Sequence, residues 1–164
     1  MAFDAFIKLD GIPGESTDDK HKEWIEVLSF SHGASQASFG SRSTGGAAGS
    51  QRADLTDFSF VKALDKTSPK LFLSCVKGDH IKEVTFHLNR ATGDKQKYME
   101  YKMTDVLISG YRPGGSSQSS DLPLEEVSLN FAKIEHIYTE TDHKTGKPKG
   151  DVKTWWDQSE NKGG

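Results

Sequence analysis

Apolar and polar residues alternate with a period of two through most of this chain, which is the pattern of half-buried β-strands. It is clearest in residues 3–9, 55–61, 84–88 and 124–131, where the large apolar side chains fall mainly on one face. Residues 24–30 carry large apolar side chains on both faces, so we expect this strand to be covered on both sides. The pattern predicts a mainly β protein.

One segment changes to helical spacing. Thr67 or Ser68 can cap its start, Pro69 fits the first turn because its missing N–H needs no partner there, and Gly78 supplies a left-handed stop. The apolar residues of this segment form a stripe that needs a partner surface, because a short helix is marginal alone. The stripe consists of Leu71, Phe72, Cys75 and Val76.

The remaining segments complete the β pattern. Residues 91–95 contain Gly93 and Asp94 and indicate a hairpin loop, and residues 113–121 form a Gly/Ser-rich loop before another strand. About eight or nine strands with one helix predict a compact antiparallel β-barrel of two sheets with one flanking α-helix, because such a topology hides sheet edges. Residues 1–164 are expected to form one domain with a short C-terminal tail.

Residues 31–52 break the alternation, since 16 of these 22 residues are Gly, Ala, Ser or Thr. Such residues do not build a core, and a connection of this length inside a compact domain is usually functional or disordered. We expect residues 39–51 to project as an extended loop. A tolerated surface insertion is the alternative, because loop length has a small entropic cost.

Charge and cysteine content narrow the function classes. A net charge of −3, with acidic and basic residues interspersed, disfavours nucleic acid and anionic membrane as partners, because both need a clustered positive face. Cys75 is the single cysteine, which indicates folding in a reducing cytosol without disulfides. Residues 1–10 lack a basic leader and an apolar run, so any export is expected to proceed without a cleaved signal peptide.

Candidate catalytic chemistry is sparse. The six histidines show no metal-binding spacing, Cys75 falls on the apolar stripe of the helix, and the motifs of serine hydrolases and P-loop enzymes are missing from the sequence. Glu125 and Glu126 are interpreted as solvated charges at a strand start. We therefore expect no enzyme activity, no metal and no cofactor. The aromatic residues expected in the core are Trp24, Phe30, Phe58, Phe60, Phe86 and Phe131.

Five segments in fixed order resemble one known family. They are MAFDAFIKLDGIPGES, HKEWIEVLSFSHG, DLTDFSFVKALDKTSPKL, ISGYRPGG and EEVSLNFAKI. Their joint order and spacing resemble the Hcp family, the haemolysin-coregulated tube proteins of type VI secretion. The likeness extends from the first strand to about residue 138 and is looser in residues 31–52 and 141–164.

The resemblance implies a β-barrel-like protomer that assembles into a homo-hexameric ring. Such rings stack into a hollow tube that contractile sheath proteins propel with a VgrG-class spike at its tip, and small effector proteins travel in the lumen. It also implies assembly in the cytoplasm followed by secretion without a signal peptide.

The resemblance also assigns roles to individual positions. The ring-stacking loop is expected to include Phe39, Ser41, Arg42, Ser43, Thr44 and Gln51. The wall of the lumen is expected to include Ser31, Gly33 and Ser35. Possible subunit-interface residues are Asp4, Lys8, Asp65, Lys66, Arg112 and Trp156, each of which could equally be a solvated surface residue, or for Trp156 a packed one.

Two other functions stay open from the residues alone. A monomeric β-sandwich binding module, for example for carbohydrate, could use Trp155 or Trp156 as a stacking platform. A hydrolase with scattered acid residues has less support, because adjacency of carboxylates in sequence does not identify a catalytic pair.

Overall fold

The structure is a computed structural model that describes residues 2–36, 38–39, 49–50, 52–91 and 93–164. Its described elements are β1 (Phe3–Leu9), β2 (Ile25–Val27), β3 (Ser29–Ser31), β4 (Ala34–Ser35), β5 (Ser38–Phe39), β6 (Gly49–Ser50), β7 (Asp54–Leu55), β8 (Phe58–Ala63), α1 (Ser68–Lys77), β9 (His80–Arg90), β10 (Lys97–Gly114), β11 (Leu124–Thr141), β12 (Pro148–Asp157) and β13 (Lys162–Gly163).

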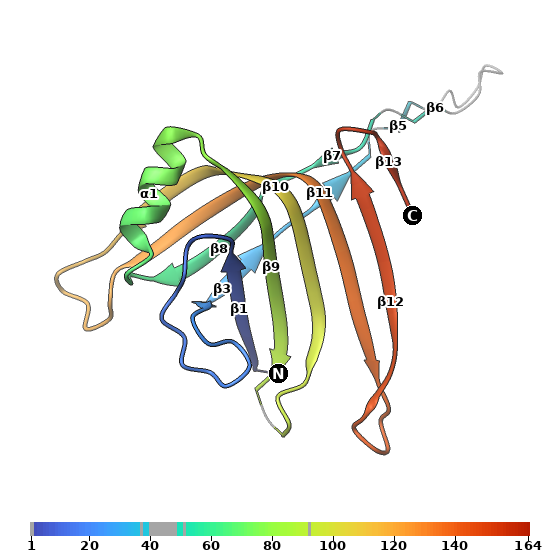
Figure 1. Ribbon diagram of the computed structural model, residues 1–164, viewed down its shortest axis with the longest axis horizontal. Helices are drawn as coiled ribbons and strands as arrows, with labels where there is room; N and C mark the ends of the chain where they lie inside the picture. The colour runs from blue at the N-terminus through green and yellow to red at the C-terminus, as the bar shows by residue number, and fades with distance from the viewer. Residues whose placement is uncertain (1, 37, 40–48, 51, 92) are drawn as a thin grey trace.

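One antiparallel sheet forms the body of the protein (Figure 1). Among the described residues it has nine strands, in the order β13-β12-β11-β10-β9-β1-β2, with β8 paired to β11 and β3 paired to β8. Two short ribbons, β4 with β7 and β5 with β6, extend beyond it at one end of the sheet. The prediction of a mainly antiparallel β fold with a single flanking helix is confirmed for the described part of the chain.

The nine-stranded sheet curls around the core but does not close into a continuous barrel. The sequence had predicted a barrel made of two sheets, whereas a single sheet surrounds the core here. The 18-residue strand β11 uses one edge twice, pairing with β8 through residues 124–129 and with β12 through residues 133–141. Residues 25–31 join the ends of the curl, because β2 pairs with β1 while β3 pairs with β8. The β1 side and the β8 side of the sheet are therefore connected by the bent segment 25–31, and not by direct strand pairing between β1 and β8.

Apolar side chains on the concave face form the core. Of the six aromatic residues expected there, Phe58, Phe60, Phe86 and Phe131 are buried, whereas Trp24 and Phe30 are half-buried. Leu28 contradicts the expectation for residues 24–30, because its side chain is 53% exposed. It lies where the chain passes from β2 to β3, and its amide donates to the Val61 carbonyl at 2.8 Å instead of continuing the first ladder.

The helix begins and ends as its sequence indicates. Thr67 occupies the N-cap position, proline lies in the first turn, and Gly78 adopts a left-handed φ of 68° that closes the helix. Thr67 makes no side-chain capping hydrogen bond, because its hydroxyl donates to Asp65 Oδ1 instead. The predicted apolar stripe is only partly covered. Leu71 and the small residues Ser68 and Ser74 are the buried positions of the helix, because the sheet approaches it closely on that side.

Candidate assembly surfaces

A buried ion pair anchors the helix to the sheet. Along β8, Lys62 follows Phe58 and Phe60 on the alternating positions that face the interior. Along β11, Glu125 lies directly opposite Lys62 in the strand register. Lys62 Nζ lies 2.6 Å from Glu125 Oε2, and both side chains are fully buried. The interpretation of Glu125 as a solvated charge is therefore wrong, because the strand alternation turns it inward.

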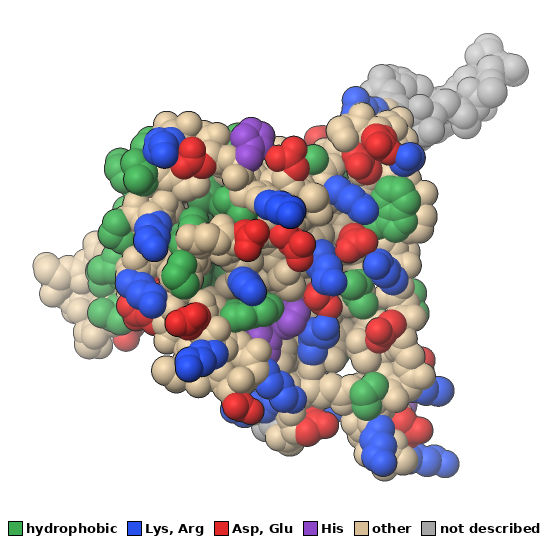
Figure 2. Space-filling model, viewed as in Figure 1, with side chains coloured by type: hydrophobic (Ala, Val, Ile, Leu, Met, Phe, Trp, Pro, Cys, Tyr) green, Lys and Arg blue, Asp and Glu red, His purple; other side chains and the backbone are tan. Residues whose placement is uncertain are grey.

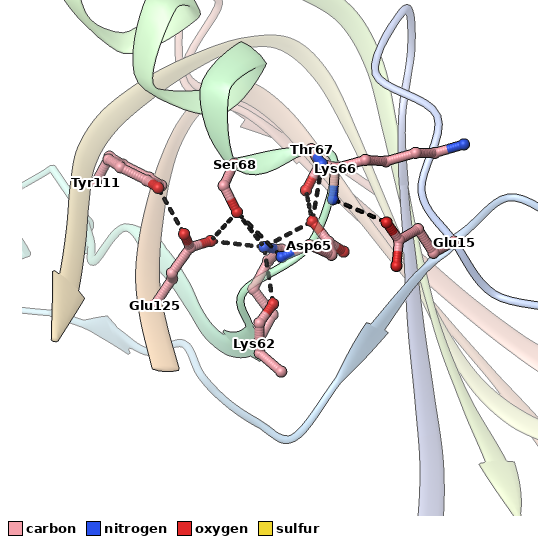
Figure 3. A network of polar contacts seen from close by, with 9 residues as sticks. Glu15, Lys62, Asp65, Lys66, Thr67, Ser68, Tyr111 and Glu125 are labelled. Atoms are coloured by element: carbon pink, nitrogen blue, oxygen red, sulfur yellow. Dashed lines mark hydrogen bonds and ion pairs between the residues drawn. The ribbon is translucent and has the colours of Figure 1, made fainter. Parts of the chain in front are cut away.

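Polar groups from three other positions complete this network (Figure 3). Ser68 Oγ, in the first turn of α1, donates to Glu125 Oε2 at 2.9 Å. Tyr111 OH, from β10, donates to Glu125 Oε1 at 2.6 Å. Asp65 Oδ1 lies 3.0 Å from Lys62 Nζ and also accepts the Thr67 backbone N–H at 2.8 Å. The start of α1 is thereby tied to β8, β10 and β11.

The electrostatics of the network keep Tyr111 neutral. Burial raises the pKa of Tyr111 to about 12, and its hydrogen bond to the Glu125 carboxylate acts in the same direction. A phenol that donates to an ionised carboxylate would lose this bond on ionising. Tyr111 therefore serves as a fixed hydrogen-bond donor.

The outer face of α1 is an exposed apolar surface. Phe72, Leu73 and Val76 are 54%, 53% and 62% exposed. Figure 2 shows hydrophobic side chains gathered along the edge of the molecule where α1 lies in Figure 1. We call Phe72, Leu73 and Val76 the helix face. Three adjacent large apolar side chains on a tethered helix are typical of a contact surface.

A second apolar surface lies at the other end of the sheet, on β11 and β12 (Figure 1). Tyr138 and Val152 are opposite each other in the register of these strands, and both side chains are exposed. The far edge of β12 is covered by β13 only near Trp156 and Asp157, among the residues described. We call Tyr138, Val152 and the uncovered edge of β12 the strand face.

The positions predicted to line the lumen lie close together in the chain but differ in structure. Ser31 ends β3 and Ser35 lies in β4, and both side chains are exposed. The carbonyl of Gly33 accepts hydrogen bonds from the backbone and hydroxyl of Thr56 at 2.9 and 3.1 Å. These contacts hold the segment as an extended ribbon, and its role as a lumen wall stays a prediction.

The predicted ring-stacking loop is only partly described. Ser41, Arg42, Ser43, Thr44 and Gln51 lie outside the described residues. Phe39 is in β5, where it pairs with Gly49. The described base of this loop is thus an antiparallel ribbon, although the sequence composition had suggested an unstructured connection.

The predicted interface residues separate into groups. Asp4 and Asp65 line one pocket of about 490 Å³ together with Glu15. Next to it, the backbone N–H of Lys66 donates to Glu15 Oε1 at 3.0 Å (Figure 3). The structure therefore brings Asp4, Asp65 and Lys66 to one region.

The other three predicted interface residues lie elsewhere. Lys8 and Arg112 are exposed on β1 and β10. Trp156 is half-buried on β12, and a Cβ at Gly163 would lie 2.7 Å from its ring. β13 therefore packs closely on one side of Trp156, while Trp155 and Trp156 together line a surface pocket of about 340 Å³. Trp155 is covered differently, with Lys133 Nζ 4.8 Å from its ring centroid.

Sequence reasoning missed a second polar cluster, on the outer face of β1, β9 and β10. Phe6, His87 and Glu100 form a row across these strands in register, and His21 stacks on Phe6 with ring centroids 4.3 Å apart. The nearby His87 imidazole and Lys97 ammonium lower the pKa of Glu100 to about 2. The one sequence signal for this cluster was Phe6, an aromatic residue on the otherwise polar face of β1.

Comparison with known proteins identifies the chain. The fold to compare is a curled antiparallel sheet with one helix packed on it and exposed apolar side chains on the helix and on β11 and β12. The family model described as "Type VI secretion system effector, Hcp" matches residues 6–138. Protein hcp1 of Pseudomonas aeruginosa is 36% identical over 162 residues, which is 98% of each chain.

Solved structures agree with this match. A protein described as a type six secretion system protein has a TM-score of 0.93 and 34% identity, with 99% of this chain and 100% of that chain covered. Hcp1 from Salmonella typhimurium has a TM-score of 0.80 and 31% identity, with 99% of each chain covered. The chain belongs to the Hcp family, and the resemblance seen in its sequence is confirmed. It is a tube protein of type VI secretion. No helix in the described ranges has the length and apolarity to span a membrane.

Proposed function

We propose that this chain forms a homo-hexameric ring and that these rings stack into the hollow inner tube of a type VI secretion system. The observation that carries the ring is the placement of the helix face and the strand face at opposite ends of the curled sheet (Figure 1). Two different surfaces on one protomer allow a head-to-tail contact, which closes into a ring when the rotation between subunits permits.

The remaining partners follow from the family. The tube assembles in the cytoplasm inside contractile sheath proteins, carries a VgrG-class spike at its tip and is then secreted. Small effector proteins occupy its lumen, and the polar segment with Ser31, Gly33 and Ser35 suits a water-filled wall. Residues 39–51 make the axial contact with the next ring. No catalytic step is assigned to the chain.

The test of the ring is the mass and shape of the purified full-length protein. Light scattering is expected to give about 109 kDa, six times the 18.1 kDa chain, and negative-stain images are expected to show particles with a central hole. Solitary monomers at high micromolar concentration would contradict the proposal.

The helix face can be tested by substitution. Leu73→Lys with Val76→Lys places two charges on the helix face without touching the core, so we expect a folded monomer. Lys70→Ala, an exposed change on the same helix, is the control and should keep the ring. A double variant that still forms rings would exclude the helix face as the contact.

A further inference from the structure

Two histidines are in direct contact where the loop between β1 and β2, residues 10–24, folds onto the outer face of the sheet. His21 Nδ1 lies 2.8 Å from Asp18 Oδ2, and His21 Nε2 lies 2.9 Å from His87 Nδ1. His87 Nε2 then makes an ion-pair contact of 3.3 Å with Glu100 Oε1, short of full hydrogen-bond geometry. The result is a row of carboxylate, imidazole, imidazole and carboxylate.

This row specifies how many protons the two rings carry. An ionised carboxylate only accepts, so the Asp18 contact requires an N–H on His21 Nδ1. The 3.3 Å approach of Glu100 Oε1 favours an N–H on His87 Nε2, a buried nitrogen that completes no hydrogen bond. The contact between His21 and His87 requires one N–H and one lone pair. All three contacts are satisfied together only with three protons on four ring nitrogens, one more than two neutral rings hold. Two neutral rings leave one contact unmade, and two imidazolium rings place N–H against N–H.

Aromatic rings cover His21 and pack beside His87. His21 is buried between Phe6 and the edge of Trp24, whose centroid lies 4.8 Å from that of His21 and 4.6 Å from that of His87. Burial lowers the pKa of His21 below its ordinary value of 6.5, against the pull of Asp18. Both carboxylates are ionised near neutrality, since the pKa of Asp18 is lowered by its hydrogen bond to His21 and that of Glu100 is about 2.

Other charged groups around the pair are lysines and two further carboxylates, Asp94 and Asp151. On β10, Lys97 Nζ lies 2.5 Å from Glu100 Oε2 and Lys102 Nζ lies 3.8 Å from Oε1, so this carboxylate stays ionised without His87. Lys20 disfavours a proton on His21, and Lys95 of the β9–β10 hairpin favours the ionised form of Asp18. Asp151 of β12 lines the same pocket as both histidines.

We propose that His21 and His87 form a proton-sharing latch that holds residues 10–24 on the sheet and that is tightest when the pair carries one excess proton. The latch weakens on both the acid and the alkaline side. This device belongs to the single protomer and does not depend on ring assembly.

The effect of pH on loop opening follows from the number of protons that the two histidines bind in the closed and in the open loop. Two solvated imidazoles at the general reference pKa of about 6.5 share on average one excess proton at that pH, and this is the reference for the open loop. Above it the open pair binds fewer protons than the latch, so rising pH favours opening. Below it the open pair binds more, so falling pH favours opening. Each side has a limiting slope of about tenfold in the opening constant per pH unit.

Amide hydrogen exchange of the full-length protein tests the latch. After correction for intrinsic exchange rates, protection of residues 15–24 should be greatest at about pH 6.5 and lower at about pH 5.5 and about pH 8. Nitrogen NMR of the histidine rings should show three protonated nitrogens out of four in the pair at the optimum. A one-directional or flat pH dependence, or a pair with two or four protonated nitrogens, would overturn the proposal.

A substitution separates proton sharing from simple packing. In His87→Asn the amide reaches the position of Nδ1 and can either donate to His21 or accept from it, so acid should no longer reduce protection. His80→Asn is the matched control, because His80 Nδ1 contacts Asp105 Oδ1 at 2.9 Å in an exposed pair. It should keep the maximum near pH 6.5. A maximum that persists in His87→Asn would overturn the latch, and the NMR count on the unmodified chain decides if this variant does not fold.

Discussion

Lys62 and Glu125 are direct cross-strand partners whose charged atoms meet 2.6 Å apart with both side chains fully buried. Taking two charges out of water has a large desolvation cost, which only good geometry and further hydrogen bonds offset. Here Ser68 and Tyr111 each donate to the carboxylate, and Asp65 gives the ammonium a second acidic partner. The network therefore fixes the position of α1, and with it the helix face.

Glu125→Ala leaves the Lys62 ammonium buried without its main partner. We expect the free energy of unfolding to fall by about 3 to 5 kcal/mol, measured by urea denaturation with an unchanged slope. The triple variant Lys62→Met, Glu125→Leu and Tyr111→Phe replaces the buried ion pair together with the phenol that donates to it. Its free energy of unfolding should fall by less than that of Glu125→Ala, because neither member of the buried pair is left without its partner. A triple variant less stable than Glu125→Ala would contradict this account.

Glu100 should give the protein an acid-dependent stability. Its pKa is lowered from 4.5 to about 2, so the ionised form stabilises the fold fully above pH 4.5, and this contribution is lost as the pH falls through about 2. The contribution amounts to about 3 kcal/mol at most. In Glu100→Gln, stability measured by denaturant titration should change less between these pH values than in the native chain. An equally steep dependence in the variant would assign the effect to other carboxylates.

Position 14 requires glycine because the backbone of Trp24 and Ile25, at the start of β2, passes directly beside it. A Cβ at this position would lie 2.3 Å from the carbonyl oxygen of Trp24, and the Gly14 N–H donates to Glu23 O at 2.6 Å. Gly14→Ala is expected to destabilise the protein by about 1 to 3 kcal/mol, seen in thermal unfolding. Gly114→Ala is the control, since a Cβ there meets no atom within 4 Å, and it should stay within about 0.5 kcal/mol of the native chain.

Residues 41–50 are predicted to serve stacking and not folding. Replacing them with a tight turn should leave the circular dichroism spectrum and single rings intact while abolishing filaments in negative-stain images, because the axial contact is removed. An equal number of exposed substitutions in the loop at residues 115–121 provides a control that should still stack. Loss of folding in the shortened chain would show that the segment is structural.

Most strands and the helix could be predicted from short sequence patterns. Alternation located β1, β8, β9 and most of β10 and β11, and the proline and glycine around α1 set its bounds, since both signals act within a few residues. The predicted interface positions Asp4 and Asp65 stand near each other, which sequence spacing did not indicate.

What the sequence alone determined is the β-rich class, the single helix and, through many weak motifs in order, the Hcp family. The tertiary structure decided which side chains on alternating positions turn inward, so that Glu125 is buried and Leu28 is not. It also decided that His21 meets His87, 66 positions apart in the chain. The reason is physical: periodicity fixes which residues share a face, but only the register and curl of the sheet determine what that face packs against.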